Sequence, residues 1–148
     1  MPDRRPQYDD EEHLGISFFR RSVVGDLSNL TLPRTFFGRS EIRDTRFRNT
    51  DLRESNFCWN DFVGIDFSHA VLRDCDLRAS MFERVSFVEA DLASADLRRS
   101  RFTNCRFDRA SMEGAVLTRE QGKTIALSAA QIAAVKWVDN EGEEPEGG

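Results

Sequence analysis

The chain has little of what most catalytic and cofactor sites are built from. Its 148 residues include two histidines and three cysteines, and the cysteines show no metal-ligand spacing. It has no glycine-rich phosphate loop and no serine on a nucleophile elbow. These absences predict a protein with no catalytic residues, no cofactor and no metal site.

Long apolar segments are also missing. No run approaches the roughly 20 residues that cross a bilayer, and the opening MPDRRPQYDDEEHLGIS has no apolar signal-peptide core. An odd number of cysteines argues against a disulfide framework and for a reducing compartment. We therefore expect a cytoplasmic protein without membrane association.

What the chain does have is an apolar residue at every fifth position from Phe37 to Leu117. Seventeen consecutive positions follow this period, and with 39% apolar residues such a run arises by chance on the order of once in ten million. We call these residues the spine. They are Phe37, Ile42, Phe47, Leu52, Phe57, Phe62, Phe67, Leu72, Leu77, Phe82, Phe87, Leu92, Leu97, Phe102, Phe107, Met112 and Leu117. Leu27 and Leu32 extend the same register weakly towards the N-terminus.

A five-residue period fits neither regular element. On an α-helix, positions five apart are rotated by about 140°, and on a straight strand they lie on opposite faces. A chain that turns after every five residues buries the whole spine, and repeated turns produce a solenoid. The residue two before each spine position is mostly small, as a tight inward-facing slot requires, and the other three positions carry nearly all the charge.

A second period shows how many pentads make one coil. Residues twenty apart resemble one another, and the clearest column is all Phe: Phe47, Phe67, Phe87 and Phe107. Four pentads per coil give about four to five coils at ~4.8 Å each.

The units TDLRE, NDFVG, CDLRA and ADLASADLRR resemble the consensus of the pentapeptide-repeat family, which is small–Asp/Asn–Leu/Phe–any–any. The resemblance implies an all-β solenoid, a right-handed quadrilateral β-helix with one pentad on each side. We place this β-helix at residues 35–119, after an N-terminal cap with degenerate first repeats at 14–34. Residues 1–13 are expected to be a disordered tail, 120–138 a C-terminal segment with a helix, and 139–148 a disordered acidic tail.

The predicted C-terminal helix begins with a capping box, Ser128 and Gln131, and runs from about Ala129 to Val138. Its apolar stripe is expected to be Ile132, Val135 and Trp137. Two interpretations stay open. The helix covers the last coil as a lid, or it forms a homodimer, as resemblance to the topoisomerase-binding members of the family implies.

Outward charges define two candidate faces, although the β-helix region as a whole is neutral, with fourteen Arg and fourteen acidic residues. The acidic face carries Asp51, Glu54, Asp74, Asp91 and Glu113 against Arg53 and Arg73. The arginine face carries Arg39, Arg78, Arg98, Arg99 and Arg119 against Asp76 and Asp96. These faces are either a mixed solubilising surface or a polarised rod that orients on a charged partner.

Two large aromatic residues, Phe36 and Trp59, are expected on the surface of the arginine face, with Cys58 beside them as a candidate reactive thiol. They mark a contact with another protein or a docking site for the Phe18–Phe19 segment.

We expect a non-catalytic protein-interaction scaffold. The family resemblance implies a specific partner, a type II topoisomerase such as DNA gyrase or topoisomerase IV, protected from poisons by DNA mimicry. The neutral coil counts against a DNA mimic, because duplex DNA carries one charge per ~1.7 Å. The alternative is a regulatory or assembly adaptor with an unrelated protein partner. Direct nucleic-acid binding is disfavoured, because Asp76 and Asp96 lie among the arginines.

Overall fold

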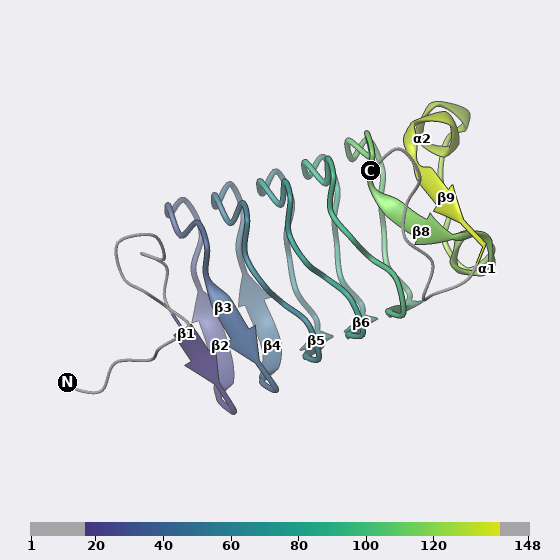
Figure 1. Cartoon of the computed structure of the whole chain (residues 1–148). Coiled ribbons are helices and arrows are strands. Elements are labelled where there is room, and N and C mark those ends of the chain that lie inside the picture. The colour runs from purple at the N-terminus through teal and green to yellow at the C-terminus, as the bar shows by residue number, and fades with distance from the viewer. Residues whose placement is uncertain (1–16, 140–148) are drawn as a thin grey trace.

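The structure is a computed structural model that describes residues 17–139, and in it the chain winds into a rod of stacked coils (Figure 1). The strands are β1 (Ser17–Phe19), β2 (Ser22–Asp26), β3 (Phe36–Gly38), β4 (Glu41–Arg46), β5 (Asp61–Val63), β6 (Met81–Glu83), β7 (Arg101–Thr103), β8 (Val116–Thr118) and β9 (Lys136–Val138). The helices are α1 (Arg119–Gly122) and α2 (Ala129–Ala134).

Strands of successive coils pair in parallel with a register of twenty residues. The largest sheet has the order β2-β4-β5-β6-β7, and Glu41, Asp61, Met81 and Arg101 lie side by side along it. Isolated parallel bridges repeat the same spacing on the other sides, for example from Asp51 to Val71 to Asp91. The chain is therefore a right-handed quadrilateral β-helix, which confirms the predicted fold. It has about six turns, more than the four to five coils expected, because strands before residue 35 and after residue 119 also pair with the neighbouring coils.

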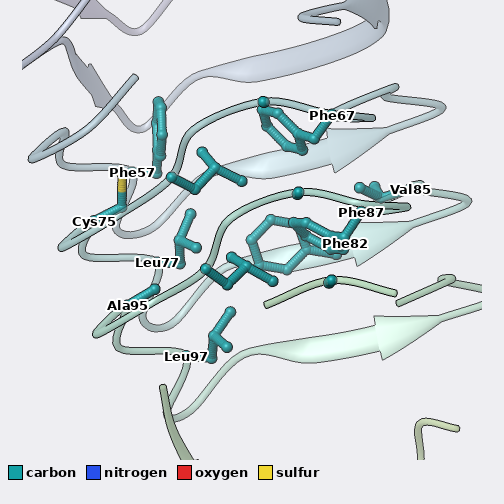
Figure 2. Close-up of a cluster of buried hydrophobic side chains, with 14 of the residues drawn as sticks. Phe57, Phe67, Cys75, Leu77, Phe82, Val85, Phe87, Ala95 and Leu97 are labelled. Atoms are coloured by element: carbon teal, nitrogen blue, oxygen red, sulfur yellow. The ribbon is translucent and has the colours of Figure 1, made fainter. Parts of the chain in front are cut away.

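The spine fills the interior. All seventeen spine residues are buried, and their aromatic rings stack in columns along the rod (Figure 2). In one column the ring centroids of Phe62 and Phe82 lie 5.0 Å apart with the rings nearly parallel, and Phe102 continues the stack. These stacks are the structural form of the twenty-residue period, since residues of like shape meet one coil apart.

The residue two positions after each spine residue forms the corner of the coil. Most of these residues are not glycine but still have a positive φ, such as Arg39 (50°), Trp59 (63°) and Arg84 (54°). This left-handed conformation costs roughly 1–2 kcal/mol per residue, and the hydrogen bonds between coils hold it in place. Because each corner side chain projects away from the core, long polar residues collect along the edges of the rod.

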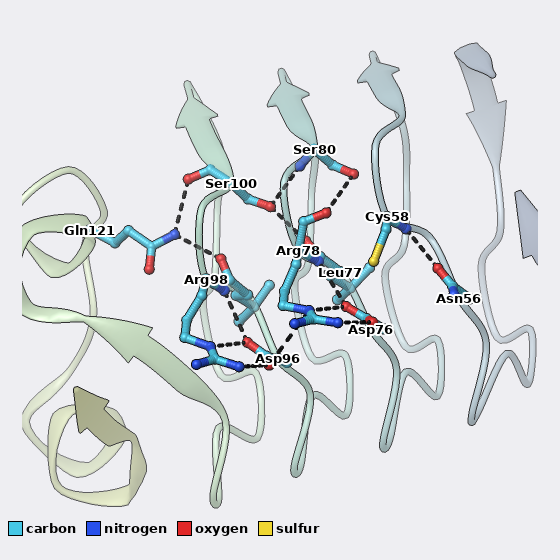
Figure 3. A network of polar contacts seen from close by, with 11 residues as sticks. Asn56, Cys58, Asp76, Leu77, Arg78, Ser80, Asp96, Arg98, Ser100 and Gln121 are labelled. Carbon is cyan, nitrogen blue, oxygen red and sulfur yellow. Dashed lines mark hydrogen bonds and ion pairs between the residues drawn. The ribbon is translucent and has the colours of Figure 1, made fainter. Parts of the chain in front are cut away.

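Small inward residues tie successive coils together along one corner (Figure 3). The backbone N–H of Ser80 donates to the hydroxyl of Ser100, and the hydroxyl of Ser80 donates to the carbonyl of Phe57. Asn60 takes the equivalent place one coil earlier, where its side chain accepts from the N–H of Ser40. The small slot therefore contributes hydrogen bonds as well as space.

The first described coil departs from the period by one residue. Strand β1 pairs with β3 at an offset of nineteen, and an irregularity between Val23 and Gly25 in β2 restores the offset of twenty. The apolar column continues even so, because Phe18 stacks on Phe37 at 4.6 Å. Leu27 and Leu32 pack on the core, as their weak register predicts.

At the other end, the capping box of Ser128 and Gln131 begins a helix as predicted, but the predicted C-terminal boundary at Val138 is wrong. Helix α2 ends at Ala134, and Val135 is already extended with ψ at 145°. The chain then forms β9, in which Lys136 donates its N–H to the carbonyl of Ala115 and pairs with β8. The open edge of β8 offers a ladder of backbone partners, which outweighs the helical spacing of the apolar residues.

Two glutamines complete the last coil. Thr118 and Gln121 form a second capping box at α1, a helix that was not predicted. The Gln121 side-chain amide donates to the carbonyls of Leu97 and Ser100, at 2.7 and 3.0 Å (Figure 3). One coil earlier, the carbonyl of Leu77 accepts from the hydroxyl of Ser100 and the carbonyl of Ser80 accepts from the N–H of Arg101, so the Gln121 amide replaces both kinds of donor. The Gln131 amide likewise donates to the carbonyls of Phe107 and Ala110, ten residues further along.

Candidate interaction surface

The carboxylates of the acidic face are partly paired with arginines. Three of its five predicted carboxylates form ion pairs: Asp51 with Arg53 at 2.9 Å, Asp91 with Arg73 at 2.9 Å, and Glu54 with Arg34 at 3.4 Å. The other two, Asp74 and Glu113, have no ion pair among the described residues. Arg34 was not among the arginines assigned to this face from the sequence, so its ion pair with Glu54 adds to the compensation by Arg53 and Arg73.

The arginine face shows a similar compensation. Arg78 forms two hydrogen bonds of 2.8 Å with Asp76, and Arg98 is held in the same way by Asp96 (Figure 3). Only 5% of the Arg98 side chain is exposed. These arginines are positioned by the carboxylate two residues earlier in their own loop, so they do not present free cations. Arg99, at the adjacent corner, is exposed.

The two aromatic residues behave differently. Phe36 is half-buried, and its ring lies beside that of Phe19 over Gly38, where a Cβ atom would come within 2.8 Å of both rings. The N-terminal Phe18–Phe19 segment thus docks beside Phe36. Trp59 stays 59% exposed at its corner and keeps the character of a contact residue.

The three residues predicted as a helical stripe are separated. Val135 is buried against the core, Trp137 lies in β9, and Ile132 is 50% exposed on α2. Ile132 and Trp137 nevertheless line one apolar groove of about 390 Å³, together with Ile125 and Leu127.

The candidate reactive groups are restrained by their surroundings. Burial, together with the neighbouring Asp76 carboxylate, raises the pKa of the Cys58 thiol to about 12, which disfavours the reactive thiolate form. Burial also raises the pKa of Cys75 and Cys105. His69 contacts Glu89 at 2.8 Å on the surface. Within residues 17–139 no group of three His, Cys, Asp or Glu side chains could hold a metal ion.

One further feature was missed as a site by sequence reasoning. At the N-terminal end of one corner, a polar hollow of about 510 Å³ lies between the first coils. It is lined by Arg20, Arg21, Ser22, Arg39, Ser40, Glu41, Trp59 and Asp61. Arg20 lies one coil before Arg39 because β1 pairs with β3 at an offset of nineteen, an irregularity that the spine does not reveal.

The repeat geometry agrees with the comparison to known families. A model of pentapeptide repeats matches in eight copies, over residues 26–57, 51–87, 61–99 and 86–119. The chain belongs to the pentapeptide-repeat family. No curated protein sequence matches it.

Solved pentapeptide-repeat proteins share the fold at low identity. HetL, from the cyanobacterium Nostoc and involved in the regulation of heterocyst differentiation, is 16% identical with a TM-score of 0.65, and the match covers 68% of this chain. The chain spans about half of HetL, 48% of its length. Rfr23, from the cyanobacterium Cyanothece, is 14% identical with a TM-score of 0.51, over 77% of this chain and 86% of that one.

QnrB1, a plasmid-mediated fluoroquinolone resistance protein, matches more weakly. It is 15% identical with a TM-score of 0.46, over 88% of this chain and 87% of that one.

Among the described residues, neither helix has the length and apolar character needed to span a membrane.

Proposed function

We propose that this pentapeptide-repeat protein is a non-catalytic scaffold that binds another protein through the faces and corners of its rod. The observation that supports this best is the division of the chain, with the spine fully buried and, apart from Arg98, the charged side chains of the described residues at least partly exposed. The candidate nucleophiles are buried or have a raised thiol pKa, which leaves the surface to carry the function. We also propose that the protein is located in the cytoplasm.

The narrowest form of the proposal is binding to a type II topoisomerase, DNA gyrase or topoisomerase IV. Its support is the family resemblance and the row of carboxylates on the acidic face. The ion pairs of Asp51, Glu54 and Asp91 weaken it, because a mimic of DNA needs free negative charge. Asp74 and Glu113 are therefore the carboxylates on which this form of the proposal depends.

A supercoiling assay tests the topoisomerase form directly. The protein is titrated into gyrase with and without a fluoroquinolone, beside the variant D74N/E113Q. We expect inhibition or protection at micromolar protein that the double variant reduces. If wild-type protein has no effect at that concentration, the topoisomerase form is wrong and the adaptor with an unrelated partner takes its place.

We also propose that a second copy docks on the C-terminal groove. Ile132 is exposed there although it is apolar, and Trp137 and Leu127 surround it. Light scattering after size exclusion should then give twice the 17.0 kDa of one chain, and I132S should return the protein to that mass. A wild-type monomer would leave α2 with the role of a lid alone.

A further inference from the structure

One edge of the rod gathers arginines that form no ion pair with the carboxylates of residues 17–139. The corner positions along it are Arg20, Arg39, Trp59, Ala79 and Arg99, all with positive φ and stacked one coil apart. Their side chains project outward for the reason given above for all corners. The hollow of about 510 Å³ lies at the N-terminal end of this edge.

The contrast with the neighbouring arginines is in their pairing. Arg78 and Arg98 are held by aspartates of their own loops, at 2.8 and 2.6 Å. Among residues 17–139, no carboxylate oxygen lies within 4.0 Å of the guanidinium of Arg20, Arg21 or Arg39. Three arginines around one hollow suit carboxylates, because the planar guanidinium donates two parallel hydrogen bonds to a carboxylate.

Trp59 supplies the apolar part of the hollow. Trp59 is 59% exposed and so presents its indole to the hollow's rim. Tryptophan and arginine together are the residue types that dominate the binding energy of protein interfaces. The hollow therefore combines an aromatic surface with three cations.

Glu41 and Asp61 line the hollow on the adjoining strands β4 and β5, where they lie side by side. These two carboxylates would repel the continuous row of phosphates of a nucleic-acid strand. Glu41 and Asp61 repel an acidic peptide less, because the acidic side chains of a peptide are separated by neutral backbone. The charges thus favour an acidic peptide over a nucleic-acid strand.

We propose that this hollow binds an acidic peptide segment of a protein partner, with its carboxylates on Arg20, Arg21 and Arg39 and its apolar atoms on Trp59. The proposal deepens the scaffold function and rests on it. It assigns the partner a chemistry, acidic side chains, and a place, the N-terminal end of this one edge.

The test measures the fluorescence of Trp59 in a W137F background, in which the other tryptophan is removed. The probe is a peptide of eight glutamates spaced by glycines, and the matched probe replaces every glutamate by glutamine. We expect saturable binding of the acidic probe, weakened at least about tenfold in R20S/R21S/R39S and weakened by salt. Equal binding of the glutamine probe would overturn the proposal.

The control variant is R84S. Arg84 occupies the same corner position with a φ of 54° and is also exposed, but it lies on a different edge of the rod. R84S should bind the acidic probe as the wild type does, and circular dichroism melting should show that both variants are folded. Equal weakening by R84S would show that only overall charge matters and would overturn the proposal.

Two further arms separate the alternatives. Oligothymidylate of matched charge should compete poorly, and equal competition would replace the peptide by a nucleic acid. D61N should tighten binding of the acidic probe, because it removes a carboxylate from the hollow without touching the arginines. The supercoiling assay is independent of this edge, so a lack of effect on gyrase leaves the peptide result standing, and failure of the peptide leaves the topoisomerase form untouched.

Discussion

The two ends of the rod are finished in different ways. At the C-terminal end, the Gln121 and Gln131 amides take over the hydrogen bonds that another coil would make, and β9 pairs with β8. At the N-terminal end, the described coil keeps the aromatic column but is one residue short, and arginines collect around a hollow. The C-terminal end is sealed by hydrogen bonds, whereas the first described coil carries arginines that form no ion pair with the carboxylates of residues 17–139.

The largest expected effect separates the middle of the rod from its N-terminal end. F82A should lower the free energy of unfolding by about 3–5 kcal/mol, because Phe82 is buried and stacks on Phe62 and Phe102. F18A should cost about 1–2 kcal/mol, because Phe18 is half-buried and, among the described residues, stacks only on Phe37. Urea denaturation measures both, and equal losses would show that the first coil is as tightly packed as the middle.

The sealed end depends on its glutamines. Q121M keeps the size of the side chain but removes both donors, and leaves the carbonyls of Leu97 and Ser100 without them. We expect a loss of about 1–3 kcal/mol in the free energy of unfolding. E120Q changes an exposed neighbour in the same helix and should be close to neutral. If Q121M were neutral as well, the seal would have to come from β9 instead.

The capping box of α2 tests the same end more gently. S128A removes the oxygen that accepts from the N–H of Gln131 and should cost about 0.5–2 kcal/mol. Amide exchange at Ile132 that is faster in S128A than in the wild type, with exchange in the middle of the rod unchanged, would locate the loss in α2. S111A is the control, because the Ser111 side chain is exposed and forms no hydrogen bond to the described residues. Equal losses in the two variants would contradict the capping role.

The repetitive part of the fold was predictable because its signal is local and repeated. The spine, the four columns and the capping box of Ser128 could all be recognised from residue types at fixed spacings. The end of α2 could not, because Val135 and Trp137 continue a helical stripe, and only the open edge of β8 makes them extended. Thr118 and Gln121 carry the same spacing as Ser128 and Gln131, so α1 could have been found by the same rule.

The candidate site was less predictable because it depends on pairing in three dimensions. Outward positions could be assigned from the period, but not which charges neutralise one another. Arg78 and Asp76 are two residues apart, and the turned backbone between them lets the guanidinium reach back. The hollow near Arg39 depends on a missing residue in the first coil, which no count of spine positions shows.

The smallest expected effect is the loss at low pH of the stability that the charge pairs of the regular coils contribute. Burial alone would raise the pKa of Asp76, but hydrogen bonds from Arg78 and Cys58 outweigh it and hold the pKa below its ordinary 3.8. A group with a lowered pKa stabilises the fold above its unfolded pKa, and that stability is lost as the pH falls through the folded value. The difference in urea midpoint between wild type and D76N should therefore be present at pH 6 and shrink below about pH 4. D74N is the control, because Asp74 has no ion pair among the described residues to lose. A difference for D76N that stays constant down to pH 2 would mean that the clamp on Arg78 acts through packing and not through charge.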